Sequence, residues 1–211
     1  MYLSKIDLDI RHPSVRQALR DVNDLHRNLM SGFGMIPSSS MARAEKDILF
    51  RLYTRRDAIY LLVTSAEKPD AKTLEKRGFY TDEARIRDIS KLKELLISGR
   101  TLRFELLASP CKKVRGDGEN SRRFFLEHPE ERAEWLNRKG QQGGFQIIRL
   151  EELGNRIDIY GHRQGVEIKN SAVLFSGILC ISDQETFWQS YTRGIGPGKA
   201  YGLGMLSLGR A

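Results

Sequence analysis

The order of strand-like and helical segments constrains the fold of this 211-residue chain more than any other feature. Alternating apolar and polar residues indicate strands, and apolar residues spaced three and four positions apart indicate helices. In the first half, the pattern predicts a strand at 2–9, a helix opening at Pro13, a hairpin formed by 47–54 and 58–65, and a loop or short helix at 67–81.

The second half repeats this order with an insertion. It predicts a strand at 101–108, a charged segment at 112–123, a helix at 129–139, strands at 144–150 and 172–181 around a polar ribbon at 157–170, a helix at 183–193 and a closing strand at 203–208. Each half therefore fits the β-α-β-β-α-β pattern of a ferredoxin-like domain. We expect an α+β protein of two tandem ferredoxin-like domains, 1–97 and 98–211, joined by a short linker. No sequence repeat relates the halves, so this duplication rests on the pattern.

A glycine-rich segment separates the last predicted helix from the closing strand. Residues 194–208 contain five glycines and Lys199. Glycine exposes main-chain N–H groups, which can form an anion-binding nest. A nucleotide-binding P-loop is excluded, because it needs Gly at 193 and a hydroxyl at 200, where this chain has Arg193 and Ala200. We interpret the segment as a phosphate-handling loop, with a turn that needs glycine only for tight bends as the alternative. Its candidate RNA contacts are Gly194, Gly196, Gly198, Lys199 and Gly202.

The charge of the chain favours a polyanionic partner. There are 35 basic and 27 acidic residues, a formal net charge of +8. No apolar run approaches the roughly 20 residues that span a bilayer, and the N-terminal segment is unlike a signal peptide. We therefore expect a cytoplasmic protein with no membrane partner. Cys111 and Cys180 lack metal-ligand spacing, so we expect no metal site and no cofactor.

The charged insertion is the second candidate for nucleic-acid contact. Residues 111–123 carry five positive and two negative side chains. Arginines on a hairpin or loop can follow the phosphates of an A-form stem, whose deep groove offers little base readout. A solvated surface loop is the alternative. The candidate RNA-binding side chains are Lys112, Lys113, Arg115, Arg122 and Arg123.

One of the four histidines lies where it could carry out chemistry. His12 and His128 flank prolines at element ends, and His162 lies in a Gly-His-Arg turn. His26 follows Val22 by four residues, on the shoulder of the apolar face of the first helix. A partly buried imidazole there can act as a general acid or base. A structural histidine hydrogen-bonded to a carbonyl is the alternative.

Four sequence segments together resemble one known family. They are Met1–Lys5, Leu25-His26, Phe104–Pro110 and the ending Gly194–Leu208. In these the chain resembles the CasE family, the CRISPR RNA endoribonucleases of type I-E Cascade complexes, from residue 1 to about 208.

The resemblance implies two ferredoxin-like domains and metal-independent cleavage of precursor CRISPR RNA at the base of the repeat stem-loop. The 2′-OH would attack the adjacent phosphate and leave a 2′,3′-cyclic phosphate, and the product would stay bound with other Cascade subunits. His26 matches the catalytic histidine of the family.

The chain departs from the family pattern near this histidine. The family often has a tyrosine three residues before it, where Asn23 can hydrogen-bond but cannot exchange a proton. Ser109-Pro110 replaces the usual Asn-Pro. Lys169 matches a position that is basic in some relatives, which implies that it stabilises the phosphorane; a surface lysine is an equal alternative.

The leading hypothesis is a CRISPR RNA endoribonuclease with His26 and Lys169 as its catalytic groups. The first alternative is a non-catalytic RNA-binding subunit of the same fold, in which His26 is structural. An enzyme for phosphorylated small molecules is the third. It is supported by the glycine loop but not by the charge.

Overall fold

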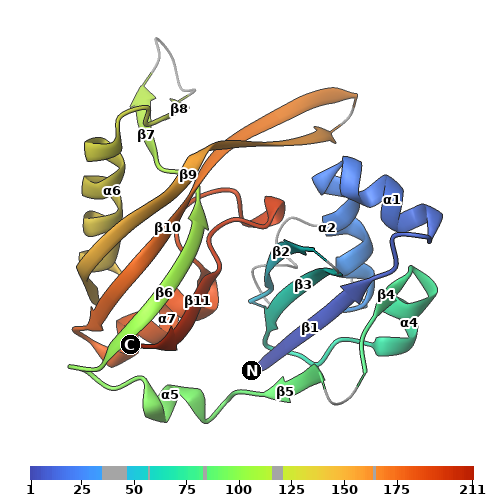
Figure 1. The fold of residues 1–211 in the computed structure, drawn as a ribbon, viewed down its shortest axis with the longest axis horizontal. Coiled ribbons are helices and arrows are strands. Elements are labelled where there is room, and N and C mark those ends of the chain that lie inside the picture. Colours follow the sequence, from blue (N-terminus) through green and yellow to red (C-terminus); the bar gives the residue numbers. More distant parts are fainter. Residues whose placement is uncertain (35–46, 57, 83–84, 116–120, 164) are drawn as a thin grey trace.

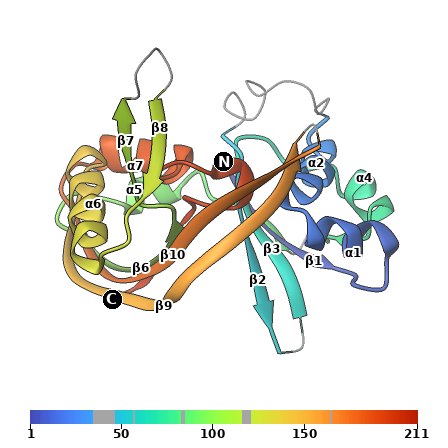
Figure 2. The ribbon, with the colours of Figure 1, turned by 90° about the horizontal axis from the view of Figure 1, so that it is seen from above.

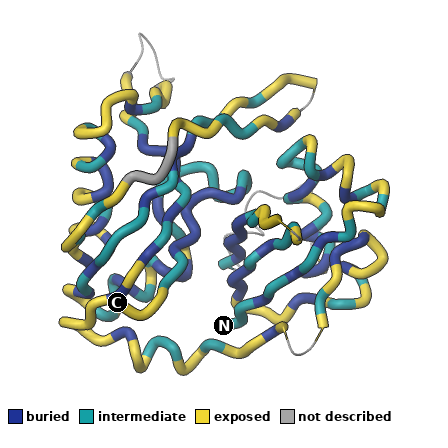
Figure 3. The backbone as a smooth tube through the Cα atoms, viewed as in Figure 1, coloured by how far each residue is buried: buried dark blue, intermediate teal, exposed yellow. Residues whose placement is uncertain are grey.

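In the described part of the chain, the two larger sheets are antiparallel, have helices packed on one face and lie side by side (Figures 1 and 2). The computed structural model describes residues 1–34, 47–56, 58–82, 85–115, 121–163 and 165–211. Buried residues concentrate where helices cover the sheets (Figure 3). Each sheet has its own cluster of buried apolar side chains, so the molecule has two cores.

The first sheet has the strand order β2-β3-β1-β4, and β5 pairs with the N-terminal end of β1. Its elements are β1 (Tyr2–Leu8), α1 (Pro13–Arg20), α2 (Val22–Ser31), β2 (Leu49–Arg55), β3 (Ala58–Ser65), α4 (Ala71–Lys76), β4 (Phe79–Tyr80) and β5 (Ile86–Asp88). Ser4, Ile6 and Leu8 of β1 are buried while the residues between them are partly exposed, because alternate strand residues point to opposite faces. The helices cover this buried face.

The second sheet has the equivalent order β11-β6-β10-β9. Its elements are β6 (Thr101–Ala108), β7 (Cys111–Arg115), β8 (Ser121–Phe125), α6 (Pro129–Gln142), β9 (Phe145–Arg163), β10 (Val166–Ile181), α7 (Gln184–Arg193), the 3-10 turn η2 (Lys199–Tyr201) and β11 (Leu206–Arg210). The strands β7 and β8 form a separate hairpin between β6 and α6. Both halves therefore have the ferredoxin-like arrangement, and the predicted fold class is confirmed.

Two details differ from the sequence-based expectation. The single helix predicted from Pro13 is two helices, because Asp21 adopts an extended conformation (φ −138°, ψ 111°) and caps α2. The strand at 144–150 and the ribbon at 157–170 are parts of β9 and β10, which continue beyond the sheet as one long antiparallel ribbon. This ribbon crosses from the second sheet to the helices of the first half (Figures 1 and 2). The ribbon thus lets the second half reach α2.

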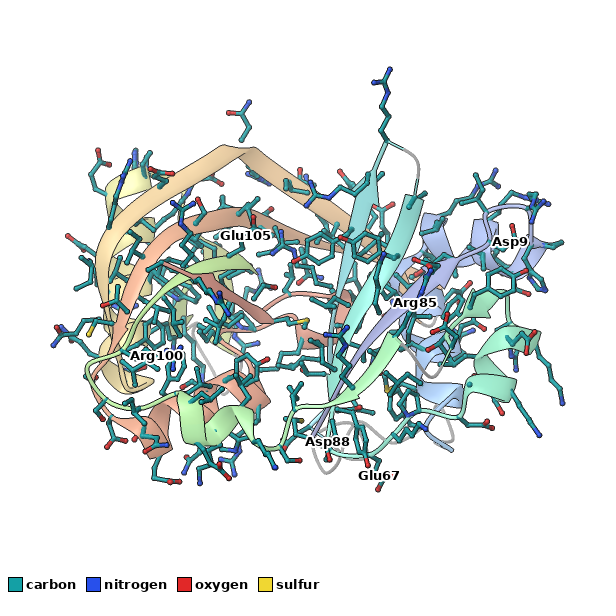
Figure 4. The ribbon with its side chains drawn as sticks, turned by 60° about the horizontal axis from the view of Figure 1, so that its bottom comes forward. Asp9, Glu67, Arg85, Asp88, Arg100 and Glu105 are labelled. Atoms are coloured by element: carbon teal, nitrogen blue, oxygen red, sulfur yellow. The ribbon has the colours of Figure 1, made fainter. Side chains whose placement is uncertain are left out.

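Polar contacts connect the two halves along their facing strands. Glu105 of β6, labelled in Figure 4, forms an ion pair with Arg51 of β2 at 3.2 Å. The Tyr53 and Ser207 hydroxyls lie 3.1 Å apart. The segment between the sheets contains α5 (Leu92–Leu95), which contacts α7 through a Lys93–Glu185 ion pair of 2.8 Å. The predicted boundary at 97/98 lies just after α5, and the division into domains 1–97 and 98–211 stays a prediction.

Candidate RNA-binding surface and active site

His26 lies on α2, with its ring against the core of the first half. Leu25 and Leu29 anchor the helix in that core. The His26 side chain is half-buried, its Nε2 atom is buried, and its ring centroid lies 6.1 Å from that of Phe50, at an interplanar angle of 35°. Such partial burial suits an imidazole that exchanges protons with a bound substrate.

The glycine-rich segment approaches the same place from the other end of the chain. η2 packs against α2 and β2. A Cβ at Gly202, where φ is +73°, would lie 3.1 Å from Cε2 of Phe50. The Phe50 ring therefore joins His26 to the glycine-rich segment, which follows it by about 170 residues in the sequence.

Packing against the protein itself explains why several of these positions are glycine. Gly194, Gly196 and Gly198 all have positive φ, and added Cβ atoms would lie within 3.0 Å of Leu49, the Trp135 ring and Leu203 respectively. The N–H groups of Ile195, Leu203 and Gly204 donate to main-chain carbonyls. These three N–H groups shape the loop, and an anion-binding nest formed by the other N–H groups of the segment stays a prediction. The Lys199 ammonium donates to the Gly196 carbonyl oxygen at 2.8 Å.

The structure brings the loop and the basic hairpin together around one open depression of about 630 Å³. Of the candidate RNA-binding residues, those that line it are Lys113, Arg123, Gly194, Gly196, Gly198 and Lys199. Lys139, Gln142 and Ser190 also line it; no sequence signal pointed to them, because they lie on helices predicted only for their packing. Cys111 also lines the depression, and burial raises the pKa of its thiol. The thiol therefore stays neutral and adds no negative charge to the basic side chains around it.

Two other candidate side chains of the hairpin, Lys112 and Arg122, lie on its opposite face. Lys113 pairs with Arg123 across the ladder, whereas Lys112 pairs with Phe124 and Val114 with Arg122. Cross-strand pairs share a face and neighbouring pairs alternate, so Lys112 and Arg122 point away from the depression. Lys112 lies 3.7 Å from Glu131 of α6. The side chain of Arg115 lies outside the described part of the structure.

Lys169 is held by an acidic side chain of the β9–β10 ribbon. Its Nζ atom lies 2.9 Å from Oδ2 of Asp158. The other carboxylate oxygen, Oδ1, accepts hydrogen bonds from Arg156 and Ser171. The hydrogen bond from Lys169, followed by those from Arg156 and Ser171, lowers the pKa of Asp158, and the same contact raises the pKa of Lys169. Lys169 is therefore a protonated cation at neutral pH.

The other described contact of Lys169 also lies within the ribbon. Lys169 is paired with Tyr160 of β9, and its Nζ atom lies 5.7 Å from the centroid of the Tyr160 ring. The structure therefore places Lys169 on the β9–β10 ribbon, and its catalytic role stays a prediction.

The remaining histidines and Asn23 have structural contacts. The Nδ1 atom of His12 accepts from the Ser14 N–H at the start of α1, and His128 occupies the N-cap position of α6. His162, expected in a turn, lies on β9, where its carbonyl accepts from Asn23 at 2.8 Å and its ring approaches Asp21 at 3.1 Å. The sequence contained no signal for this contact between residues about 140 positions apart.

Within the described ranges, no three His, Cys, Asp or Glu side chains come together as a group that could hold a metal ion. Across the same ranges, no helix is both long enough and apolar enough to cross a membrane.

Comparisons with known proteins place the whole chain in one group. A family model described as CRISPR associated protein matches residues 1–210. The CRISPR-associated endoribonuclease Cse3 of Thermus thermophilus is 30% identical over 223 residues, covering 99% of both chains. The CRISPR system Cascade subunit CasE of Escherichia coli is 27% identical over 219 residues, covering 99% of this chain and 98% of that protein. Among solved structures, Thermus thermophilus Cse3 bound to an RNA representing a pre-cleavage complex has a TM-score of 0.80 and 28% identity, with 98% of each chain covered.

Proposed function

Because the chain belongs to the CRISPR associated protein family, as a member of the CasE type, we propose that it is an endoribonuclease that cleaves precursor CRISPR RNA at the base of the repeat stem-loop. The observation that carries this proposal is the placement of His26 next to the glycine-rich segment, which also lines the basic depression. RNA bound in the depression would thus lie close to a half-buried imidazole.

The depression is the proposed contact surface for the RNA stem. Lys113 and Arg123 on one side and Lys199 on the other place positive charge around it. Such side chains bind phosphates of an A-form stem without reading its bases, and they make the affinity depend on salt. The ammonium of Lys199 would exchange the Gly196 carbonyl for a phosphate oxygen when RNA binds.

The proposed chemistry needs proton transfer and charge stabilisation, and we propose that it proceeds without a metal ion. The 2′-OH of the nucleotide before the scissile bond attacks the adjacent phosphorus, and the 5′-oxygen of the next nucleotide leaves. The products are a 2′,3′-cyclic phosphate and a 5′-OH. His26 takes the proton from the 2′-OH or gives one to the leaving oxygen.

A cation near the reacting phosphate would stabilise the added negative charge of the phosphorane. Lys169 is our candidate, since its raised pKa keeps it protonated. To act in this way it must exchange Asp158 for the phosphate. Asn23 takes no part in proton transfer, because an amide does not titrate at ordinary pH.

The partners follow from the relatives. The Escherichia coli relative is named a Cascade subunit, and we propose that this chain likewise retains its RNA product and assembles with other type I-E Cascade subunits in the cytoplasm. The first alternative, a non-catalytic RNA-binding subunit, uses the same depression and differs only in the role of His26.

The decisive experiment is incubation of the purified protein, in EDTA, with a labelled stem-loop RNA that carries the CRISPR repeat of its host. We expect one cut at the stem base with a cyclic-phosphate end, absent for His26→Ala and unchanged for His128→Ala, a matched histidine that is exposed at the start of α6. A 2′-deoxy nucleotide at the attacking position should also abolish the cut. Tight binding without any cut by the wild-type protein would favour the non-catalytic alternative, and a requirement for Mg²⁺ would reject the metal-independent chemistry.

A further inference from the structure

The N-terminal turn of α2 meets the end of the β9–β10 ribbon, far from the body of the second sheet (Figures 1 and 2). The ribbon belongs to the half that carries the RNA-binding depression, whereas α2 belongs to the half that carries His26. The contact between them therefore connects the surface that binds the RNA with the group that acts on it.

A single residue of the ribbon makes three polar contacts with α2. The His162 N–H donates to Oδ2 of Asp21 at 3.0 Å, and the His162 ring Nδ1 lies 3.1 Å from the same oxygen. The Asn23 amide donates to the His162 carbonyl oxygen at 2.8 Å. Both main-chain groups of His162 are thus bound by side chains of one helical turn, which fixes the ribbon in position and in direction.

Asp21 joins this contact to the start of the helix. Its other carboxylate oxygen, Oδ1, accepts from the Asn23 N–H at 2.8 Å and caps α2. The same residue, in its extended conformation, separates α1 from α2. The direction of α2 is therefore set at the residue that binds the ribbon.

Gly161 lets the ribbon approach this closely. Its φ is not in the left-handed region, so its backbone conformation does not require glycine. A Cβ there would lie 2.9 Å from Nδ2 of Asn23 and 3.0 Å from Cγ1 of Val22. The close approach of α2 explains why this position is glycine. This steric argument is independent of the hydrogen bonds made by His162.

We propose that Asp21, Asn23, Gly161 and His162 form a latch that positions α2, and with it His26, relative to RNA held by the second half. None of these is a catalytic residue; they act through the placement of His26. The inference rests on the proposed function. It also assigns a role to Asn23, which stands where the family often has tyrosine: its amide binds the ribbon instead of exchanging a proton.

Three variants test the latch. Gly161→Ala adds a methyl group between the ribbon and α2 without changing charge, and Asn23→Ala removes the amide donor. Tyr53→Phe is the matched control, since it removes one hydrogen bond between the halves on different strands. For each, the single-turnover cleavage rate is measured at saturating protein, and the Kd is measured with a stem-loop that carries a 2′-deoxy nucleotide at the attacking position.

We expect Gly161→Ala and Asn23→Ala to lower the cleavage rate about 10- to 100-fold while Kd changes less than about twofold, since small misplacement of a reacting group is costly. The double variant should cut no more slowly than the slower single variant, because both changes break one contact. Tyr53→Phe should leave both quantities unchanged. A wild-type rate in both single variants, or a loss of affinity as large as the loss of rate, would overturn the latch. If Gly161→Ala does not fold, Asn23→Ala decides alone.

His26→Ala, run in the same assay, separates this proposal from the proposed function. If His26→Ala cuts at the wild-type rate, the proposed catalytic site is wrong. If His26→Ala is inactive while the latch variants cut like the wild type, only the latch is wrong.

Discussion

Helix α2 meets the second half of the chain at two contacts of opposite chemistry. At the packing contact, the buried Phe50 ring lies between His26 and the glycine-rich segment. At the latch, polar groups of His162 bind Asp21 and Asn23 at the protein surface. Burial of apolar surface contributes strongly to stability, whereas exposed hydrogen bonds contribute little net free energy but fix direction. We therefore expect the packing contact to determine stability and the latch to determine orientation.

The largest effect is expected from Phe50→Ala, which removes the packing contact. Phe50 is 1% exposed, and loss of a buried phenyl ring lowers the free energy of unfolding by about 3–5 kcal/mol. Urea unfolding followed by circular dichroism measures this change. Asn23→Ala is the comparison at the latch and should cost less than about 1.5 kcal/mol. Equal losses in the two variants would contradict the division of roles.

The next effect concerns the glycine loop behind the packing contact. Gly196→Ala should lower the free energy of unfolding by about 2–4 kcal/mol, because it combines a strained φ with a clash against a buried ring. Gly196 has φ +78° and its Cβ would lie 2.9 Å from Trp135. Gly165→Ala is the matched control, since Gly165 has φ +77° and nothing within 4 Å. If thermal or urea unfolding shows the same loss in both, strain alone explains the glycine.

A smaller effect is expected from Asp21→Ala at the latch, about 1 kcal/mol at neutral pH for the lost helix cap. Burial acts to raise the pKa of Asp21, but the hydrogen bonds from Asn23 and His162 outweigh it and lower the pKa below 3.8. A carboxyl whose pKa is lower in the folded state stabilises above its unfolded pKa, and this contribution is lost as pH falls through the folded pKa. The stability difference between wild type and Asp21→Ala should therefore shrink below pH 3.8. Asp21→Asn, which keeps a capping oxygen, should lower the free energy of unfolding less than Asp21→Ala does. If the stability difference between wild type and Asp21→Ala grows in acid, the lowered pKa of Asp21 is not its cause.

The basic hairpin lies outside both contacts, so substitutions there should change the free energy of unfolding least, by less than about 0.5 kcal/mol. Lys113→Gln with Arg123→Gln should instead weaken RNA binding and reduce its salt dependence by about one counterion per lost phosphate contact. The pair Lys112→Gln with Arg122→Gln, on the opposite face of the hairpin, should reduce the salt dependence of RNA binding less. Binding isotherms at several salt concentrations test this prediction. If the affinity depends equally on salt for the two pairs of variants, the depression is not the contact surface for RNA.

Local patterns accounted for much of the fold but not for its finer divisions. Alternation predicted the hairpin β2–β3, and Pro13 correctly marked the start of α1. The break at Asp21 was missed, although an aspartate that can cap a helix was a signal for it. The basic insertion was correctly placed between a strand and a helix, but the separation of its charges onto two faces required the register of β7 and β8.

The sequence by itself determined the order of elements, the positions of the glycines and the charge of the insertion, because each depends on residues close together in the chain. Only the tertiary structure decided which groups meet. Phe50 joins His26 to Gly202, Asn23 binds the ribbon, and Lys169 forms an ion pair with Asp158. These outcomes depend on packing between distant segments and on the register of paired strands. A one-residue change of register would turn every side chain of a strand to the other face.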